Sequence, residues 1–144
     1  CAVSAGNPVT SKLESLRTDI TDKETSAKLA IAMIYQPDCS WCKKQGVTLS
    51  KIHHNCQQVV DVSLIGFRGN KRQLKRELKH FDKQLPAYSA NRKFISNVGG
   101  ISASPTLLFF NQQGELLAKR KGYVEGQKLF KAIQQATNNQ CSLG

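Results

Sequence analysis

The sequence predicts an α/β domain with a central mixed sheet flanked by helices, and three observations support this fold class. Residues 29–35 are uniformly apolar and partly β-branched, which is typical of a strand buried on both faces. A second such run lies within residues 57–67, after the helix-compatible segment 43–56, so a parallel strand–helix–strand unit is expected. The apolar segment 106–110 is followed by a glycine-containing turn and the segment 116–123, which predicts an antiparallel hairpin.

The first 28 residues are expected to precede the sheet. Residues 1–10 are small and polar, with the character of a tail. From Ser11 to Lys28 the apolar positions are spaced as on a helix face, and Ser11 is followed three residues later by Glu14, a capping-box pattern. This segment therefore predicts a modest helix against the sheet.

Further helices are expected between the second strand and the hairpin, and after it. Residues 71–84 predict a strongly basic helix with one apolar face, which ends before Leu85 and Pro86. Residues 91–98 predict another helix, closed by a glycine pair. Residues 124–137 predict a last amphipathic helix, and residues 138–144 a polar tail.

Composition places the chain among single-domain globular proteins. Its 144 residues suffice for a hydrophobic core, and no apolar run approaches the roughly 18 residues of a membrane span. The net charge of +11 is the outlier, with basic residues gathered in 68–83 and 119–121. No base-stacking stripe or nucleic-acid motif accompanies them, so we expect no nucleic-acid partner. A solvated helix face is favoured over a docking surface for an acidic protein.

The pair Cys39 and Cys42 directly follows the first buried strand. Cys39 is expected at the start of a helix, where unpaired N–H groups and the macrodipole favour a thiolate. Lys43 and Lys44 add positive charge within one turn. Cys42 lies about one turn further in and can attack a mixed disulfide formed on Cys39. The pattern indicates a centre for thiol–disulfide exchange.

Two other uses of this pair are less favoured. Structural zinc needs about four ligands, and the candidates His53, His54 and Cys56 would lie roughly 15–20 Å away along the helix. A purely structural disulfide in so tight a loop confers little stability. We therefore expect no metal and no cofactor, and we assign the two histidines to an ordinary helix end.

Five cysteines indicate an oxidising compartment. Cys1 has two interpretations, which stay open. A lipid-modified N-terminal cysteine, as in bacterial lipoproteins, fits the small and polar residues that follow it. Alternatively, the chain simply begins at a cysteine.

Two motifs make the chain resemble the thioredoxin superfamily over residues 25–137. They are Cys39-Ser40-Trp41-Cys42 after a buried strand, and Ser104-Pro105-Thr106 opening the hairpin. The resemblance implies a cis Ser104–Pro105 bond, with Ser104 and Pro105 forming the wall against which a substrate backbone docks. It divides the chain into a tail and helix (1–24), the thioredoxin-like domain (25–137) and a C-terminal tail (138–144).

The long segment 66–104 is more similar to the periplasmic and membrane-anchored members of this superfamily, which implies a periplasmic location. Isomerases of the superfamily often dimerise through an added N-terminal domain, for which residues 1–25 are too short, so a monomer is expected. Met33 stands where thioredoxin keeps a buried carboxylate, so any proton relay must use water or another group. The family layout also brings the ends of the Cys-x-x-Cys helix and the last helix together. It thereby implies a structural disulfide between Cys56 and Cys141, with two free buried thiols as the alternative.

The expected function is thiol–disulfide exchange with protein substrates and an upstream redox partner. Cys39 exchanges, Cys42 resolves, and Trp41 either contacts the partner or lies folded on the surface. The helix start and its lysines favour an oxidase or isomerase, whereas the inserted segment favours a reductase, so direction stays open. The alternative is a binding or assembly module with little turnover, whose working surface is the basic helix 71–84.

Overall fold

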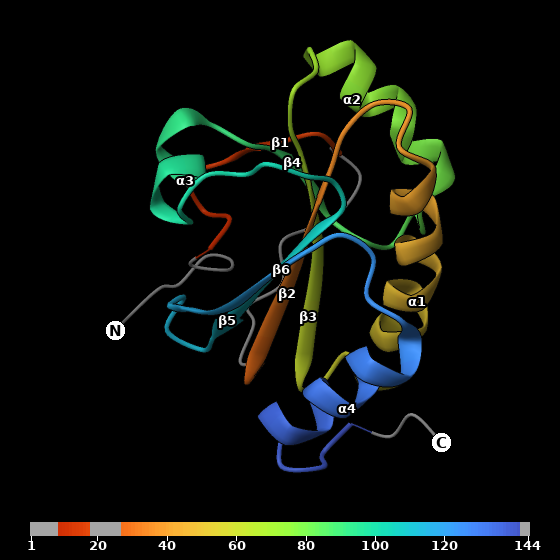
Figure 1. The fold of residues 1–144 in the computed structure, drawn as a ribbon, viewed down its shortest axis with the longest axis vertical. Helices are drawn as coiled ribbons and strands as arrows, with labels where there is room; N and C mark the ends of the chain where they lie inside the picture. Colours follow the sequence, from red (N-terminus) through yellow and green to blue (C-terminus); the bar gives the residue numbers. More distant parts are fainter. Residues whose placement is uncertain (1–8, 18–26, 142–144) are drawn as a thin grey trace.

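The computed structural model of the protein describes residues 9–17 and 27–141. A six-stranded mixed sheet runs through the molecule in the order β1-β4-β3-β2-β5-β6. Helices α1 and α4 lie on one side of this sheet, and α3 lies on the other. Helix α2 lies beyond the N-terminal end of α1 (Figure 1). The predicted α/β class with a thioredoxin-like arrangement is confirmed.

The described elements have the following bounds. The strands are β1 Glu14–Ser15, β2 Leu29–Tyr35, β3 Val60–Gly66, β4 Ala87–Ser89, β5 Thr106–Asn111 and β6 Leu116–Lys121. The helices are α1 Ser40–Cys56, α2 Lys71–Glu77, α3 Arg92–Asn97 and α4 Gly126–Ala136, with a short 3-10 helix, η1, at Leu78–His80.

Strand β2 is central, parallel to β3 on one side and antiparallel to β5 on the other. Its side chains alternate between two apolar clusters. Ile31, Met33 and Tyr35 join the cluster that includes the apolar residues of α1 and α4. Ala32 and Ile34 join the cluster under α3. Burial on both faces explains why this strand is an uninterrupted apolar run.

The helix predicted from Ser11 to Lys28 is wrong for residues 11–17. These residues turn and form β1, which pairs with β4 in the register Glu14↔Ser89. The Leu16 N–H donates to the Ala87 carbonyl at 2.8 Å, and Leu16 is buried. Backbone pairing with the edge of β4 prevails over a helical pattern that few apolar side chains support. The rest of the predicted helix, residues 18–26, lies outside the described part.

The basic helix is shorter than predicted: α2 ends at Glu77, and η1 carries the chain only to His80. Phe81 then takes an extended conformation and packs its ring 5.3 Å from that of Tyr35. The Asp82 carboxylate accepts from the Gln84 N–H at 2.9 Å, a local turn that competes with helix continuation. Burial of Phe81 and this turn end the helix before Leu85.

Candidate redox centre

Cys39 and Cys42 are joined by a disulfide, with their Cα atoms 5.3 Å apart. Cys39 is the N-cap of α1, and its sulfur accepts a hydrogen bond from the Cys42 N–H at 3.2 Å. Cys42 is completely buried, whereas Cys39 is half-buried. An outside thiolate can therefore reach Cys39 far more readily than Cys42.

The chain enters α1 through a sharp turn at Asp38, which has a φ of 60°. Aspartate tolerates this left-handed conformation better than most residues do. No acidic residue occupies the first turn of α1, and Lys43 is the fourth residue of this helix. The helix start thus offers positive electrostatic potential to a thiolate on Cys39.

The second predicted motif lies beside the disulfide, at the start of β5, which is the strand next to β2. The Ser104–Pro105 bond is cis, and the Ser104 hydroxyl donates to the Cys39 sulfur at 3.5 Å. Pro105 is buried, and its carbonyl accepts from the Gly122 N–H at 2.7 Å. Residues 65 positions apart in sequence thus form one site around Cys39.

Trp41 packs against a neighbouring ring on the surface and stays half exposed. Its ring lies against Tyr123, with centroids 5.3 Å apart, and Lys44 Nζ lies 4.8 Å from the ring centroid. Even so, 52% of Trp41 and 38% of Tyr123 stay exposed. The pair forms an apolar surface beside the disulfide. Sequence reasoning missed Tyr123, since only the folded chain brings it next to Trp41.

Gln45 fixes the loop that carries Tyr123. The fully buried Gln45 amide donates to the Val124 carbonyl at 3.1 Å and accepts from the Val124 N–H at 2.8 Å. Both backbone groups of Val124 are thereby satisfied by one side chain. This buried glutamine lies one turn after Cys42 and links the helix of the redox centre to the loop before α4.

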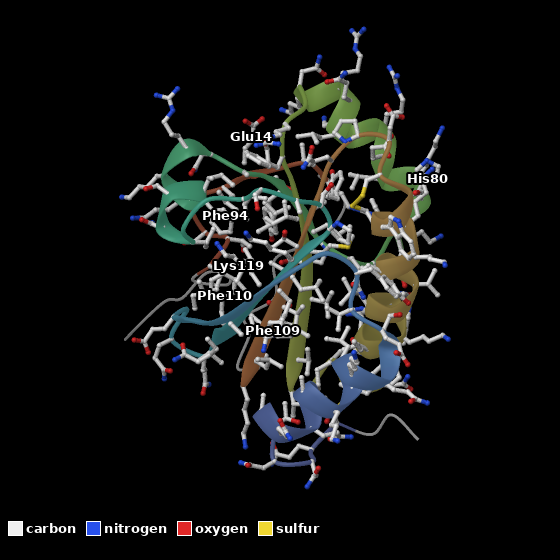
Figure 2. All side chains as sticks on the ribbon, in the orientation of Figure 1. Glu14, His80, Phe94, Phe109, Phe110 and Lys119 are labelled. Carbon is white, nitrogen blue, oxygen red and sulfur yellow. A yellow bond between two sulfur atoms is a disulfide. The ribbon has the colours of Figure 1, made fainter. Side chains whose placement is uncertain are left out.

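Lys119 supports the segment that leads to the cis bond. Its side chain donates to the Val98 carbonyl at 2.9 Å and the Gly100 carbonyl at 3.0 Å, which closes the C-terminal end of α3. Figure 2 shows Lys119 between β6 and α3, on the face that contains Phe94. Gly99 and Gly100 both have positive φ, which turns these carbonyls toward the ammonium group.

Met33 on β2 has a side chain that cannot accept a proton. Met33 is completely buried within the cluster that contains Cys42. Tyr35, two residues on, donates from its hydroxyl to the Leu74 carbonyl at 2.9 Å. Burial raises the pKa of the Tyr35 phenol far above its usual value, so this group stays protonated and does not act as a base.

Cys56 and Cys141 are joined in a second disulfide at the other end of α1. Their Cα atoms are 5.0 Å apart, and both residues are nearly inaccessible. The Gln134 side chain donates to the Cys141 carbonyl, which further holds the chain after α4. Both residues of this disulfide are shielded from solvent, whereas Cys39 of the first disulfide is partly exposed.

His53 and His54 are not arranged as metal ligands. Across residues 9–17 and 27–141, no three His, Cys, Asp or Glu side chains gather as a metal site would require. His54 instead lies 2.7 Å from the Asp82 carboxylate. Within the same ranges, no helix combines the length and apolar character needed to cross a membrane.

A half-buried cysteine at a helix start, a buried partner one turn later and a cis-proline segment opposite define the class of thiol–disulfide exchange proteins. The chain belongs to the family of thioredoxin-like domains, which matches residues 16–137. Among curated proteins, no sequence matches this chain.

Solved structures share the fold at low sequence identity. DsbF of Mycobacterium tuberculosis has a TM-score of 0.70 and 14% identity, with 91% of this chain and 99% of that chain covered. The exposed lipoprotein thioredoxin of Streptococcus pneumoniae has a TM-score of 0.68 and 19% identity, covering 85% and 96%. A DsbF homologue of Corynebacterium diphtheriae has a TM-score of 0.69 and 21% identity, covering 85% and 81%. These likenesses extend over nearly all of each chain and concern the fold.

Proposed function

We propose that the protein is a thiol:disulfide oxidoreductase that exchanges disulfides with protein substrates through Cys39 and Cys42. The unequal access to the two sulfurs carries this proposal. Cys39 is open to an incoming sulfur, whereas Cys42 is enclosed in the core and bonded to Cys39. Such asymmetry separates the attacking from the resolving role.

The exchange moves two electrons in two displacement steps. In the reducing direction, the Cys39 thiolate attacks a substrate disulfide, which forms a Cys39–substrate bond and releases one substrate thiolate. Cys42 then loses its proton to solvent and attacks the Cys39 sulfur, which restores the Cys39–Cys42 bond and releases the second substrate thiolate. The oxidising direction is the exact reversal of these steps.

Three residues around the disulfide position the substrate in this proposal. Ser104 precedes β5 and contacts the Cys39 sulfur, so an extended substrate chain paired with its backbone would bring a sulfur to Cys39. Pro105 forms the adjoining wall. Trp41, together with Tyr123, offers apolar contact.

An extracytoplasmic, oxidising location fits the two disulfides in a domain of this size. Among the structural relatives, the Streptococcus pneumoniae protein is described as an exposed lipoprotein, and a Mycobacterium tuberculosis relative as secreted. By analogy we place this protein in the periplasm. It would act as a monomer between client thiols and an upstream redox partner.

Trapping of mixed disulfides tests the proposed function. Cys42→Ser should hold substrate on Cys39 as a mixed disulfide that survives denaturation, whereas Cys39→Ser should trap nothing. Insulin reduction by the wild type should depend on Cys39. If Cys42→Ser captures no substrate and the wild type shows no exchange, the protein is instead a binding or assembly module.

A further inference from the structure

Four cations cover the solvent-facing side of α2 and η1, and we call this surface the cationic face. Its members are Arg72, Lys75, Arg76 and Lys79, all of them exposed. The opposite side of the segment buries Leu74, which packs into the core, and Glu77. Within the described part of the chain, none of the four lies within 4.0 Å of a carboxylate oxygen, whereas Lys71 pairs with Glu14. The cationic face is therefore not neutralised by the fold.

Part of this charge pattern opposes the helix that carries it, although Lys75 and Arg76 lie in the last turn, where the helix dipole favours cations. Arg72 and Arg76 are four residues apart within α2, and like charges at this spacing repel on a helix. Arg72 also lies in the first turn, which contains no acidic residue, and the helix dipole disfavours cations there. The Asn70 capping box and burial of Leu74 hold this seven-residue helix. Solubility is served equally well by charges of both signs, which would avoid this repulsion, so a cluster of one sign favours an anionic partner.

The cationic face adjoins the redox centre. Gly69, just before α2, lies so close to Pro37 that a Cβ atom on it would be 2.8 Å from the proline Cγ. Pro37 is two residues before Cys39. The exposed Arg68 and Lys44 extend the positive charge around this junction. A chain docked at Cys39 can therefore reach α2, which Figure 1 shows beyond the N-terminal end of α1.

The chemistry of the surface fits an acidic protein segment better than an anionic membrane. Helices that lie on membranes combine basic residues with large exposed apolar side chains. The large apolar side chains that are exposed in the described residues are Trp41, Val47, Leu116, Leu117 and Tyr123, none of which belongs to α2 or η1. We propose that the cationic face binds acidic segments of protein substrates while their sulfur docks at Cys39. This inference rests on the proposed exchange function and names its substrate class.

Charge reversal on α2, compared with an equal reversal elsewhere, tests the inference. The test variant is Arg72→Glu with Arg76→Glu, and the matched control is Lys128→Glu with Lys131→Glu, two exposed lysines of α4. Each fully reduced protein is mixed with a disulfide-bonded peptide flanked by four glutamates or by four glutamines. The second-order rate of exchange is followed by Trp41 fluorescence.

The wild type is expected to react about 10-fold faster with the glutamate peptide at low salt, since electrostatic steering raises association rates by at least this much. The preference should shrink at about 0.5 M salt, where the Debye length is only about 4 Å. The α2 variant should lose the preference, and the α4 variant should keep it within about two-fold. All three proteins should react equally with the glutamine peptide. The reversal places one carboxylate three residues before Lys75 and another three residues before Lys79, which turns repulsion into attraction in these pairs. The Tm of the α2 variant should therefore not fall; Arg72→Gln with Arg76→Gln replaces it if it fails to fold.

Three outcomes overturn the inference. Equal wild-type rates with both peptides exclude recognition of acidic segments and leave the exchange function intact. No reaction with either peptide removes the proposed function, and the inference with it. Co-sedimentation with phosphatidylserine vesicles that depends on Arg72 and Arg76, without a peptide preference, assigns the cationic face to a membrane.

Discussion

His54 Nε2 lies 2.7 Å from Asp82 Oδ2, which joins the last turn of α1 to the loop after η1. The same carboxylate accepts from the Ser50 hydroxyl at 2.5 Å and from the Gln84 N–H at 2.9 Å. One carboxylate therefore connects the helix of the redox centre to the inserted segment that carries the cationic face. The fold depends on this contact in a way that pH can reveal.

Asp82 should make the protein less stable in acid. Burial alone would raise the pKa of this carboxyl, but the hydrogen bonds from Ser50, Gln84 and His54 outweigh burial and lower the pKa to about 2. Because the folded pKa lies below the unfolded value of about 3.9, the stabilisation is present above about pH 4 and is lost as pH falls toward 2. Urea unfolding from pH 6 to pH 2 should show this loss in the wild type.

Asp82→Asn should lose most of that pH-dependent component. We expect a decrease of about 1–2 kcal/mol in the free energy of unfolding at pH 6, the order typical of hydrogen bonds to a charged group. Glu125→Gln, at the exposed N-cap of α4 where the side chain makes no capping hydrogen bond, provides a control for removal of one carboxylate. Equal acid sensitivity of wild type and Asp82→Asn would contradict the assignment.

Gln45→Leu should destabilise the protein and free the Trp41–Tyr123 pair. The substitution leaves the Val124 N–H and carbonyl without their buried partner, at a cost of about 2–3 kcal/mol. Urea unfolding measures the loss, and the polarity-sensitive emission of Trp41 reports the altered contact. Gln127→Leu, at an exposed position of α4, should change neither quantity. A stable Gln45→Leu protein with unchanged Trp41 emission would show that the loop is held by other contacts.

Lys119→Met should weaken substrate binding more than it slows the exchange step. The change removes the donor to the Val98 and Gly100 carbonyls and so loosens the segment that ends at Ser104. We expect KM for a peptide disulfide to rise about 3- to 10-fold, equivalent to about 0.6–1.4 kcal/mol of lost positioning, with kcat changed less. Lys121→Met on the same strand, where the side chain is exposed, is the control. A proportionate loss of kcat with unchanged KM would argue against a positioning role.

Replacing both Cys56 and Cys141 by serine should reduce stability and spare the chemistry. The bond closes 85 residues, for which the chain-entropy treatment gives about 4 kcal/mol. Thermal unfolding should show a clearly lower Tm, whereas exchange through Cys39 should persist below that temperature. A peptide map without reductant provides a direct check. Alkylation of both residues in the untreated protein would exclude the bond.

Residues with strong local patterns were predictable from the sequence. The run from Leu29 to Tyr35 is apolar on both faces because both faces of β2 are covered, so it identifies a central strand without further information. The roles of Cys39 and Cys42 could also be predicted, since their spacing and the helix that follows define the chemistry. The apolar strand β5 and the glycine-containing turn after it belong to the same group.

Features that depend on distant contacts were not predictable. The three residues of β4 are too short for a recognisable alternation, and β1 forms only because the edge of β4 is available to it. Lys119 and Gln45 have no distinguishing neighbours in sequence; their partners lie 21 and 79 positions away. The short basic helix ends early because Phe81 must reach Tyr35, a requirement that only the folded core imposes.

The enclosure of Cys42 makes release in the reducing direction a unimolecular step. Once a client is held on Cys39, Cys42 displaces it from within the same folded chain, so the rate of this step does not depend on how much free client is present. Dilution of clients will then change how often covalent complexes form and leave the rate of this displacement unaltered.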